Sequence, residues 1–408
     1  MSEYIRADRV DIDAVSAQAD LCFQRGHYEQ AIDKLIEVAS WCNSFCDIAG
    51  EANALQNIGL LRIMTRDYDG ALNTYASALS LQEGVRNVRG QAVILGRIGE
   101  IHQYSGRHDD AIEVLGRSMA LFTEAACPKE LGIVLNNMAV SYAELGDSSS
   151  AKRCYESSLE LRRQVDDIEG LAFTLHNLGS LYVEDGNFSN ARTLLEQAVE
   201  LRASTGDRRG FGQSLLQLGT LSKEVGDVAL AVAYYEWALA IARESTVLSE
   251  DDEAAALYNL GNSAVADGDP IRGLDYLKAA QSIVTHCANP TRMSMTLYSI
   301  GVAYAKLGNA DGALTHFTRA AKLHEDMKDR RRLVGTLIAI SMVLSEKGEH
   351  AQAREKLLAA LRLQEEMSWV RAQGHTLVLL AKACEAIGRR DEAASFYREA
   401  ERLSRDQG

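Results

Sequence analysis

The sequence predicts an all-α fold, an α-solenoid of about ten tandem helical hairpins that occupies residues 1–408 as a single array. Three observations lead to this fold class. Ala, Leu and Glu are abundant, whereas only 3 of the 408 residues are proline, which favours helix over a turn-rich β fold. A short segment with a loop glycine recurs about every 40 residues. Apolar residues flanking that segment repeat with the spacing of one helix face.

The recurring segment contains a glycine, a polar residue and, five residues after the glycine, an alanine. Clear copies are DGNFSNA, which ends at Ala191, and LGNADGA, which ends at Ala313. Its positions are 40 residues apart except for one step of 42 residues between Gly226 and Gly268. The loop positions are Gly26, Arg66, Gly106, Gly146, Gly186, Gly226, Gly268, Gly308, Gly348 and Gly388. The predicted units are therefore 10–48, 49–88, 89–128, 129–168, 169–208, 209–249, 250–289, 290–330, 331–370 and 371–408.

Each unit reads as two antiparallel helices. The first helix has Leu, then Ile or Leu, then Gly, then often Tyr, as in Leu175, Leu178, Gly179 and Tyr182. These positions lie on one face of a helix. In the second helix, Ala is followed four residues later by Tyr, Phe or Leu. The loop glycine between the helices suits a left-handed helix end. At the 42-residue step, Ser249 and the acids that follow it predict a helix start.

Glycines inside the first helices require a structural reason. Each costs about 1 kcal/mol relative to alanine in a helix. We expect that close approach of two helix backbones compensates for this cost. The positions are Gly59, Gly99, Gly179, Gly219, Gly261 and Gly301.

These residues together resemble the tetratricopeptide repeat. The pattern Leu-x-x-Leu-Gly-x-x-Tyr, followed by Gly-Asn/Asp-Tyr/Phe-x-x-Ala-x-x-x-Tyr-x-x-Ala, is similar to that family's repeat, whose usual unit has about 34 residues. The longer unit here resembles those of Partner-of-Inscuteable (LGN-type) scaffolds, kinesin light chains and Rap-type peptide sensors. LYNLGN, from Leu257 to Asn262, and GDRRG, from Gly206 to Gly210, are most similar to the first group. The resemblance implies a right-handed superhelix whose first helices line a concave groove.

Helical geometry predicts which side chains face that groove. At 100° per residue, the core positions of each first helix cluster on one side. The position just before the second Leu or Ile lies opposite and is mostly an amide. It is occupied by Asn57, Arg97, Asn137, Asn177, Gln217 and Asn259. Because an amide can both donate and accept hydrogen bonds, such a ladder suits the backbone of an extended peptide. The alternative is that asparagine is only tolerated at an exposed helical position.

A second groove position, five residues after the helix glycine, is acidic in the middle of the chain. It is occupied by Tyr104, Glu144, Glu184 and Glu224 in the third to sixth units, and Glu100 adds a further carboxylate. We expect these acids to favour a partner segment rich in Lys or Arg. The alternative is that these glutamates only solvate an exposed helix face.

Composition excludes several functional classes. With 57 acidic and 43 basic residues, the formal net charge is −14, and the basic stripe of a nucleic-acid-binding protein is missing. No apolar segment has the length of a membrane span or the character of a secretory signal. The seven scattered cysteines form no disulfide framework. Cys42 and Cys46 are four residues apart on one helix and could both contact one metal ion, but no His or second Cys pair lies near them in sequence to complete a site. We therefore expect a cytoplasmic protein without metal or cofactor, whose partners are neither nucleic acid nor membrane.

The predicted function is that of a non-enzymatic scaffold or adaptor that binds a peptide segment of a partner protein in the concave groove. No nucleophile elbow, nucleotide fingerprint or paired acid and base appears in the sequence. Two alternatives remain open. The chain is a regulatory protein that responds to a signalling peptide, or it is a self-assembling structural subunit of a larger complex.

Overall fold

The computed structural model describes residues 2–244, 250–287 and 289–405. Within these ranges the chain forms twenty α-helices and no strand, as the sequence predicts. The first ten are α1 (Ser2–Gln24), α2 (Tyr28–Ser44), α3 (Ile48–Met64), α4 (Tyr68–Gly84), α5 (Val88–Tyr104), α6 (His108–Glu124), α7 (Pro128–Glu144), α8 (Ser148–Gln164), α9 (Ile168–Glu184) and α10 (Phe188–Thr205). The others are α11 (Arg208–Glu224), α12 (Val228–Glu244), α13 (Glu250–Ala266), α14 (Pro270–Cys287), α15 (Pro290–Lys306), α16 (Ala310–Asp326), α17 (Arg330–Glu346), α18 (His350–Glu366), α19 (Val370–Ala386) and α20 (Arg390–Arg405).

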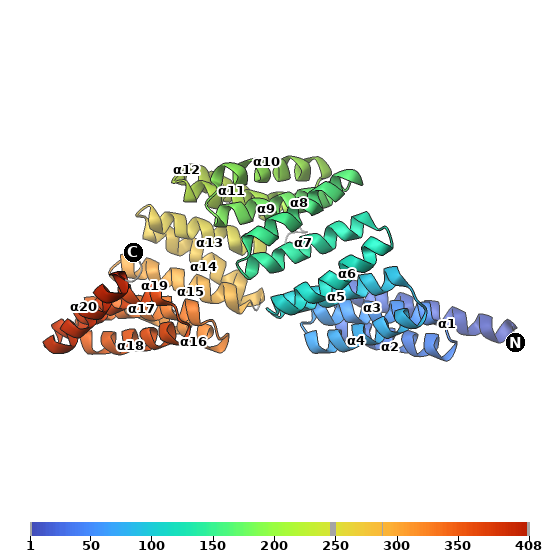
Figure 1. Ribbon diagram of the computed structural model, residues 1–408, viewed down its shortest axis with the longest axis horizontal. Helices are drawn as coiled ribbons and strands as arrows, with labels where there is room; N and C mark the ends of the chain where they lie inside the picture. The colour runs from blue at the N-terminus through green and yellow to red at the C-terminus, as the bar shows by residue number, and fades with distance from the viewer. Residues whose placement is uncertain (1, 245–249, 288, 406–408) are drawn as a thin grey trace. The chain divides into compact units, whose positions relative to one another are not determined.

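Each odd-numbered helix packs along the even-numbered helix that follows it, and Figure 1 shows these pairs as antiparallel hairpins. The chain divides into two compact units, Met1–Gly206 and Asp207–Gly408. The division falls beside the predicted boundary between the fifth and sixth repeats. The single array of ten repeats stays a prediction. The predicted helix start at Ser249 lies outside the described residues.

The turns share one design that the sequence only partly revealed. Before most helices, the residue that precedes the N-cap adopts the left-handed backbone conformation, and the N-cap itself is usually Asp or Asn. At the start of α10, Gly186 has φ +73° and Asn187 accepts a hydrogen bond from the Asn190 N–H. Arg66, which replaces the glycine in the second repeat, also has a positive φ of 62°. The turns between hairpins, which carry no glycine signal in most repeats, use left-handed residues such as Ala126 and Asp166.

The six recurring glycines that the sequence singles out inside odd-numbered helices are close-contact points, although the contacting group differs from the prediction. A Cβ on Gly179 would lie 2.8 Å from Cγ of Leu195, and 3.4 Å from the Ala191 carbonyl oxygen. The large side chain of the next helix therefore fills most of the space above the glycine, and backbone contact is secondary. The same arrangement pairs Gly59 with Tyr75, Gly99 with Leu115, Gly219 with Tyr235, Gly261 with Leu277 and Gly301 with Phe317.

Successive hairpins are joined by buried polar contacts in addition to apolar ones. Arg162 on α8, with its side chain 5% exposed, pairs with Asp167, the N-cap of α9, at 2.9 Å. Its Nε also donates to Ser158 at 3.1 Å, and the Ser158 hydroxyl donates to the Gly132 carbonyl. Burial lowers the pKa of Arg162, and the Asp167 carboxylate opposes this effect. This network ties α7, α8 and α9 into one body.

Odd-numbered helices form the inner layer of each unit. In the N-terminal unit, α5 contacts α7 and α7 contacts α9; in the C-terminal unit, α11 contacts α13 and α13 contacts α15. Contact between helices that are two apart in sequence requires the odd-numbered layer to be the more closely spaced one. From α5 to α9 and from α11 to α15, the odd-numbered helices are therefore the more closely spaced layer. The predicted groove residues belong to odd-numbered helices.

Candidate functional site

The candidate site of the N-terminal unit is the exposed side of its odd-numbered helices, which we call the groove face. Side chains spaced 0, 4, 7 and 11 residues apart share this side of a helix. The groove face comprises Asn57, Leu60 and Met64 on α3, Val93, Arg97, Glu100 and Tyr104 on α5, Ile133, Asn137, Val140 and Glu144 on α7, and Phe173, Asn177, Ser180 and Glu184 on α9. Every one of these side chains is exposed or half-buried.

The amides of the groove face are held by neighbouring helices. Asn137 Nδ2 donates to Oε1 of Glu100 at 3.3 Å, and Asn177 Nδ2 donates to Oδ1 of Asn136 at 3.3 Å. Among the described residues neither amide makes another side-chain hydrogen bond. Each therefore keeps an amide oxygen and a second N–H that can bind a ligand. The ladder is fixed in orientation and only partly saturated.

Charge on the groove face is unevenly distributed. On α5, Arg97 pairs with Glu100 at 2.9 Å and neutralises it. On α7 and α9, Glu144 and Glu184 are exposed without an ion pair in the described part of the chain. Partial burial raises the pKa of Glu184, and the nearby carboxylate of Glu144 raises it further. The acidic part of this face is therefore a pair of adjacent, mutually repelling carboxylates.

Apolar side chains that the repeat pattern did not indicate are also exposed on the groove face. Ile133 and Phe173 are 41% and 47% exposed. They lie four residues before Asn137 and Asn177, on the same side of α7 and α9. The same helical angle that selected the amides would have found them. Tyr104, 61% exposed, stacks on Tyr68 with ring centroids 6.2 Å apart.

The remaining predicted groove residues belong to the C-terminal unit. Gln217 on α11 and Asn259 on α13 are half-buried, and Glu224 at the end of α11 is exposed. The three acidic positions of the sequence pattern thus divide into Glu144 and Glu184 in one unit and Glu224 in the other.

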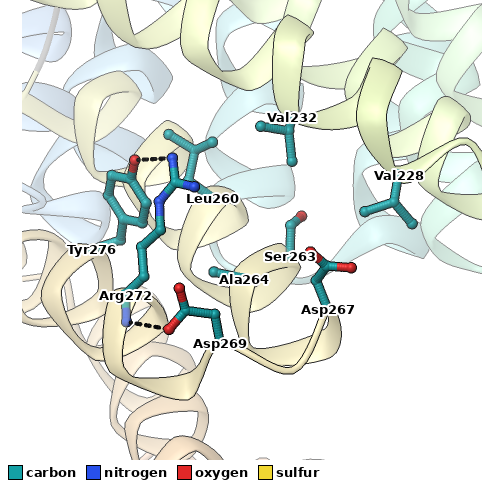
Figure 2. Close-up of a pocket in the computed structure, with 9 residues that line it drawn as sticks. All are labelled: Val228, Val232, Leu260, Ser263, Ala264, Asp267, Asp269, Arg272 and Tyr276. Atoms are coloured by element: carbon teal, nitrogen blue, oxygen red, sulfur yellow. Dashed lines mark hydrogen bonds between the residues drawn. The ribbon is translucent and has the colours of Figure 1, made fainter.

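A small cavity of about 90 Å³ lies between α12, α13 and α14 (Figure 2). Arg272 closes one side through its backbone N–H to Asp269 at 3.0 Å and its guanidinium to the Tyr276 hydroxyl at 3.2 Å. Ser263, which lines the cavity, is 2% exposed, and its hydroxyl has no hydrogen-bond partner in the described residues. A cavity of this size holds a few waters, which would satisfy Ser263, so we interpret it as a hydration site.

Catalytic groups do not converge in the described residues. No group of three or more His, Cys, Asp or Glu side chains there is placed to hold a metal ion. Burial lowers the pKa of His176 to about 3, and the charge of Arg202 contributes, so the ring is neutral. Within the described ranges, no helix combines the length and apolar character needed to cross a bilayer.

Comparison with known proteins identifies the family. Models of the tetratricopeptide repeat match residues 90–164, 170–244, 295–326 and 376–408. These matches cover more than half of the sequence, and the chain belongs to the tetratricopeptide repeat proteins. Members of this fold typically act as interaction modules rather than catalysts. The specific resemblance to Partner-of-Inscuteable scaffolds stays a prediction. No curated protein matches the sequence.

Several solved structures share the fold. A Rap protein complexed with Competence and Sporulation Factor has a TM-score of 0.57 and 16% identity, covering 87% of this chain and 98% of its own. The apo form of the quorum sensor NprR from B. thuringiensis has a TM-score of 0.57 and 14% identity, with coverages of 97% and 99%. A signal transduction ATPase with a tetratricopeptide repeat sensor, from Pyrococcus horikoshii, has a TM-score of 0.58 and 17% identity, with coverages of 85% and 53%.

Proposed function

We propose that this protein is a non-enzymatic scaffold that binds an extended segment of a partner protein on the groove face of its N-terminal unit. The observation that carries the proposal is the composition of that face. Partly hydrogen-bonded amides, two adjacent carboxylates and two exposed apolar side chains occur in register on the consecutive odd-numbered helices α7 and α9. An extended peptide presents backbone groups and alternating side chains at regular spacing, so one strand-like segment can use all three kinds of contact.

The bound segment should carry Lys or Arg where it passes α7 and α9. Glu144 and Glu184 repel one another, and a cation between them removes that repulsion while gaining two attractive pairs. Apolar side chains of the same segment would cover Ile133 and Phe173. Opposite charge across the interface would favour basic segments over acidic ones and speed their association.

Fluorescence anisotropy with labelled model peptides tests the proposal. An alternating Gly-Lys peptide should bind more tightly than its Gly-Ser counterpart, and a Gly-Glu peptide should bind weakest. Binding should weaken as salt rises, because exposed charges are screened. The double variant Glu144→Lys, Glu184→Lys should reverse the ranking of the Lys and Glu peptides.

The matched control reverses two exposed glutamates on the outer, even-numbered helices of the same unit, Glu156→Lys on α8 and Glu196→Lys on α10. It changes the net charge by the same amount away from the groove face. If this control alters peptide ranking as much as the groove variant, attraction is a property of the whole acidic surface and the site is wrong. A pulldown from lysate with mass spectrometry, comparing wild type with the groove variant, would then identify partners.

A peptide-responsive regulatory role is the second candidate. It is favoured by the shared fold of a Rap protein solved with Competence and Sporulation Factor and of the quorum sensor NprR. Under this role, the bound segment would be a free peptide, and its binding would alter the affinity for a second protein. Measuring partner affinity with and without saturating peptide separates the two roles, since a simple scaffold shows competition or no effect.

A further inference from the structure

A second cavity, of about 280 Å³, lies within the C-terminal unit, among α13, α15, α16 and α17. Its volume is near the lower end for cavities that take small ligands, and about three times that of the hydration cavity beside Ser263. Six of its seven lining residues lie on the odd-numbered helices α13, α15 and α17, and the seventh, His324, lies on α16.

Aromatic and thioether groups form the walls. Tyr258 on α13, with Met295 and Tyr298 on α15, line the cavity. The Tyr298 ring packs against Phe317, with centroids 5.3 Å apart, which holds it in place. Neither tyrosine hydroxyl makes a hydrogen bond within the described residues. Such walls favour an aromatic ring, because rings pack well against one another and against methionine sulfur.

One buried polar atom of the cavity lacks a partner. His324 on α16 is only 2% exposed, and its Nδ1 makes no hydrogen bond in the described part of the chain. Burial lowers the pKa of His324, with Asp329 opposing and Arg332 adding to the effect, so its ring is neutral at pH 7. A neutral imidazole has one donor and one acceptor nitrogen. Leaving such an atom unpaired costs free energy, which a ligand with a hydrogen-bonding atom would recover.

A glycine on α17 leaves one side of the cavity without a covering side chain. Gly335 on α17 is exposed, and a Cβ built on it would meet no atom within 4 Å. Unlike Gly179, it is not required for helix packing. A flat group can lie directly against the α17 backbone there. Beside it, the guanidinium of Arg332 is already paired with Asp329, so the cavity has no free charge to attract an ion.

We propose that this cavity binds the side chain of a polar aromatic residue, tyrosine or tryptophan, of a partner segment. The ring would lie between Tyr298 and Gly335, and its hydroxyl or indole N–H would meet His324 or the tyrosine hydroxyls. Only the source of the side chain rests on the proposed function; the cavity's choice of chemistry is tested on its own.

The probes are N-acetyl amides of Trp, Tyr, Phe, Leu and Lys, observed by saturation-transfer NMR with the full chain. The Trp and Tyr amides should show saturation transfer. The Phe, Leu and Lys amides should show none, or should bind at least about tenfold more weakly. A tenfold difference in affinity corresponds to about 1.4 kcal/mol. Gly335→Leu fills the cavity and should abolish the signal. The control is Gly116→Leu on α6, where a Cβ also meets nothing within 4 Å and which is not among the residues that line this cavity.

His324→Phe separates a ligand contact from a structural misfit. It keeps a ring and removes the unpaired nitrogen, so thermal stability should hold or rise. If His324 contacts the ligand, the preference for Tyr over Phe should shrink in this variant. Equal transfer from all amides, no transfer from any, or transfer that survives Gly335→Leu would overturn the proposal. Failure here would leave the Gly-Lys peptide result untouched, since that binding involves the other unit.

Discussion

Substitution of Gly179 by alanine measures how far helix packing outweighs helix propensity in this fold. By propensity alone, alanine in place of glycine stabilises a helix by about 1 kcal/mol. At Gly179, however, the new Cβ would lie 2.8 Å from Cγ of Leu195 and 3.0 Å from its Cδ2. Leu195 and Ala191 are both fully buried, so neither can move toward solvent. Overpacking of this kind typically costs about 1–3 kcal/mol.

The net expectation is that Gly179→Ala destabilises the protein by about 0–2 kcal/mol, the overpacking cost less the propensity gain. Gly116→Ala is the control, because that glycine lies inside α6 with open space around its Cβ, and it should stabilise by about 1 kcal/mol. Urea unfolding of both variants gives the difference. Adding Leu195→Ala to Gly179→Ala should cost less than the two single effects summed, as expected for contacting residues. If Gly179→Ala stabilises the protein as much as Gly116→Ala does, the close contact between position 179 and Leu195 does not affect the free energy of unfolding.

Three further predictions concern the turns, the hairpin ties and the amide ladder. Arg66→Gly should raise stability by about 0.5–1 kcal/mol in thermal unfolding. It removes the strain of a non-glycine residue in the left-handed backbone conformation, and this gain exceeds the entropy cost of ordering a glycine. Arg162→Met should lower stability by about 3–5 kcal/mol in urea, because it leaves Asp167 without its buried partner; a neutral result would mean that the pair contributes nothing. Asn137→Ala with Asn177→Ala should weaken peptide binding by about 1–3 kcal/mol and, since each amide makes one internal hydrogen bond, should also lower stability by about 0.5–1.5 kcal/mol per bond. Unchanged binding in that variant would remove the amides from the site.

The repeat pattern could be predicted from the sequence because helix packing restricts which residues can occupy its positions. Gly179 and its equivalents recur since only a hydrogen atom fits beneath the large residue of the next helix. The turns between hairpins were less readable, because Ala126 and Asp166 adopt left-handed backbone without a glycine to signal it. The Asp or Asn cap that follows such a turn is the residue that could have marked it, as at Asp167.

The candidate sites could be predicted from the sequence only in part, because each depends on contacts between helices. Helical angles indicate which side of one helix faces outward, and that was enough to select Asn137 and Glu184. They do not indicate what a neighbouring helix contributes, so the bonds from Asn137 to Glu100 and from Asn177 to Asn136 emerged only from the fold. The cavity around His324 draws on four helices from three repeats, and no periodicity within one repeat could have located it.

The pH dependence of binding gives a separate test of the groove face. The pKa of Glu184 is raised by partial burial and by Glu144, so its ionisation opposes folding. The stabilising effect of its protonated form is fully present below the unfolded-state pKa and is lost as pH rises through the higher folded-state pKa. A bound Lys or Arg favours the ionised carboxylate and lowers that pKa. Binding of a basic peptide should therefore release a proton and strengthen as pH rises from near 4.5, the usual value for Glu, toward neutrality.

Glu184→Gln should flatten this pH dependence and weaken binding at neutral pH, without weakening the fold there, because it removes a repelling charge. Calorimetric titration of the Gly-Lys peptide near pH 4.5, where the Glu184 carboxyl is still partly protonated, in buffers of different ionisation enthalpy measures the proton released. The control Glu196→Gln, on the outer helix α10, should leave the pH profile unchanged. If wild type releases no proton, or if Glu196→Gln changes the profile as much as Glu184→Gln does, the bound cation does not lie beside Glu184. The basic segment would then have to bind on a surface other than the groove face.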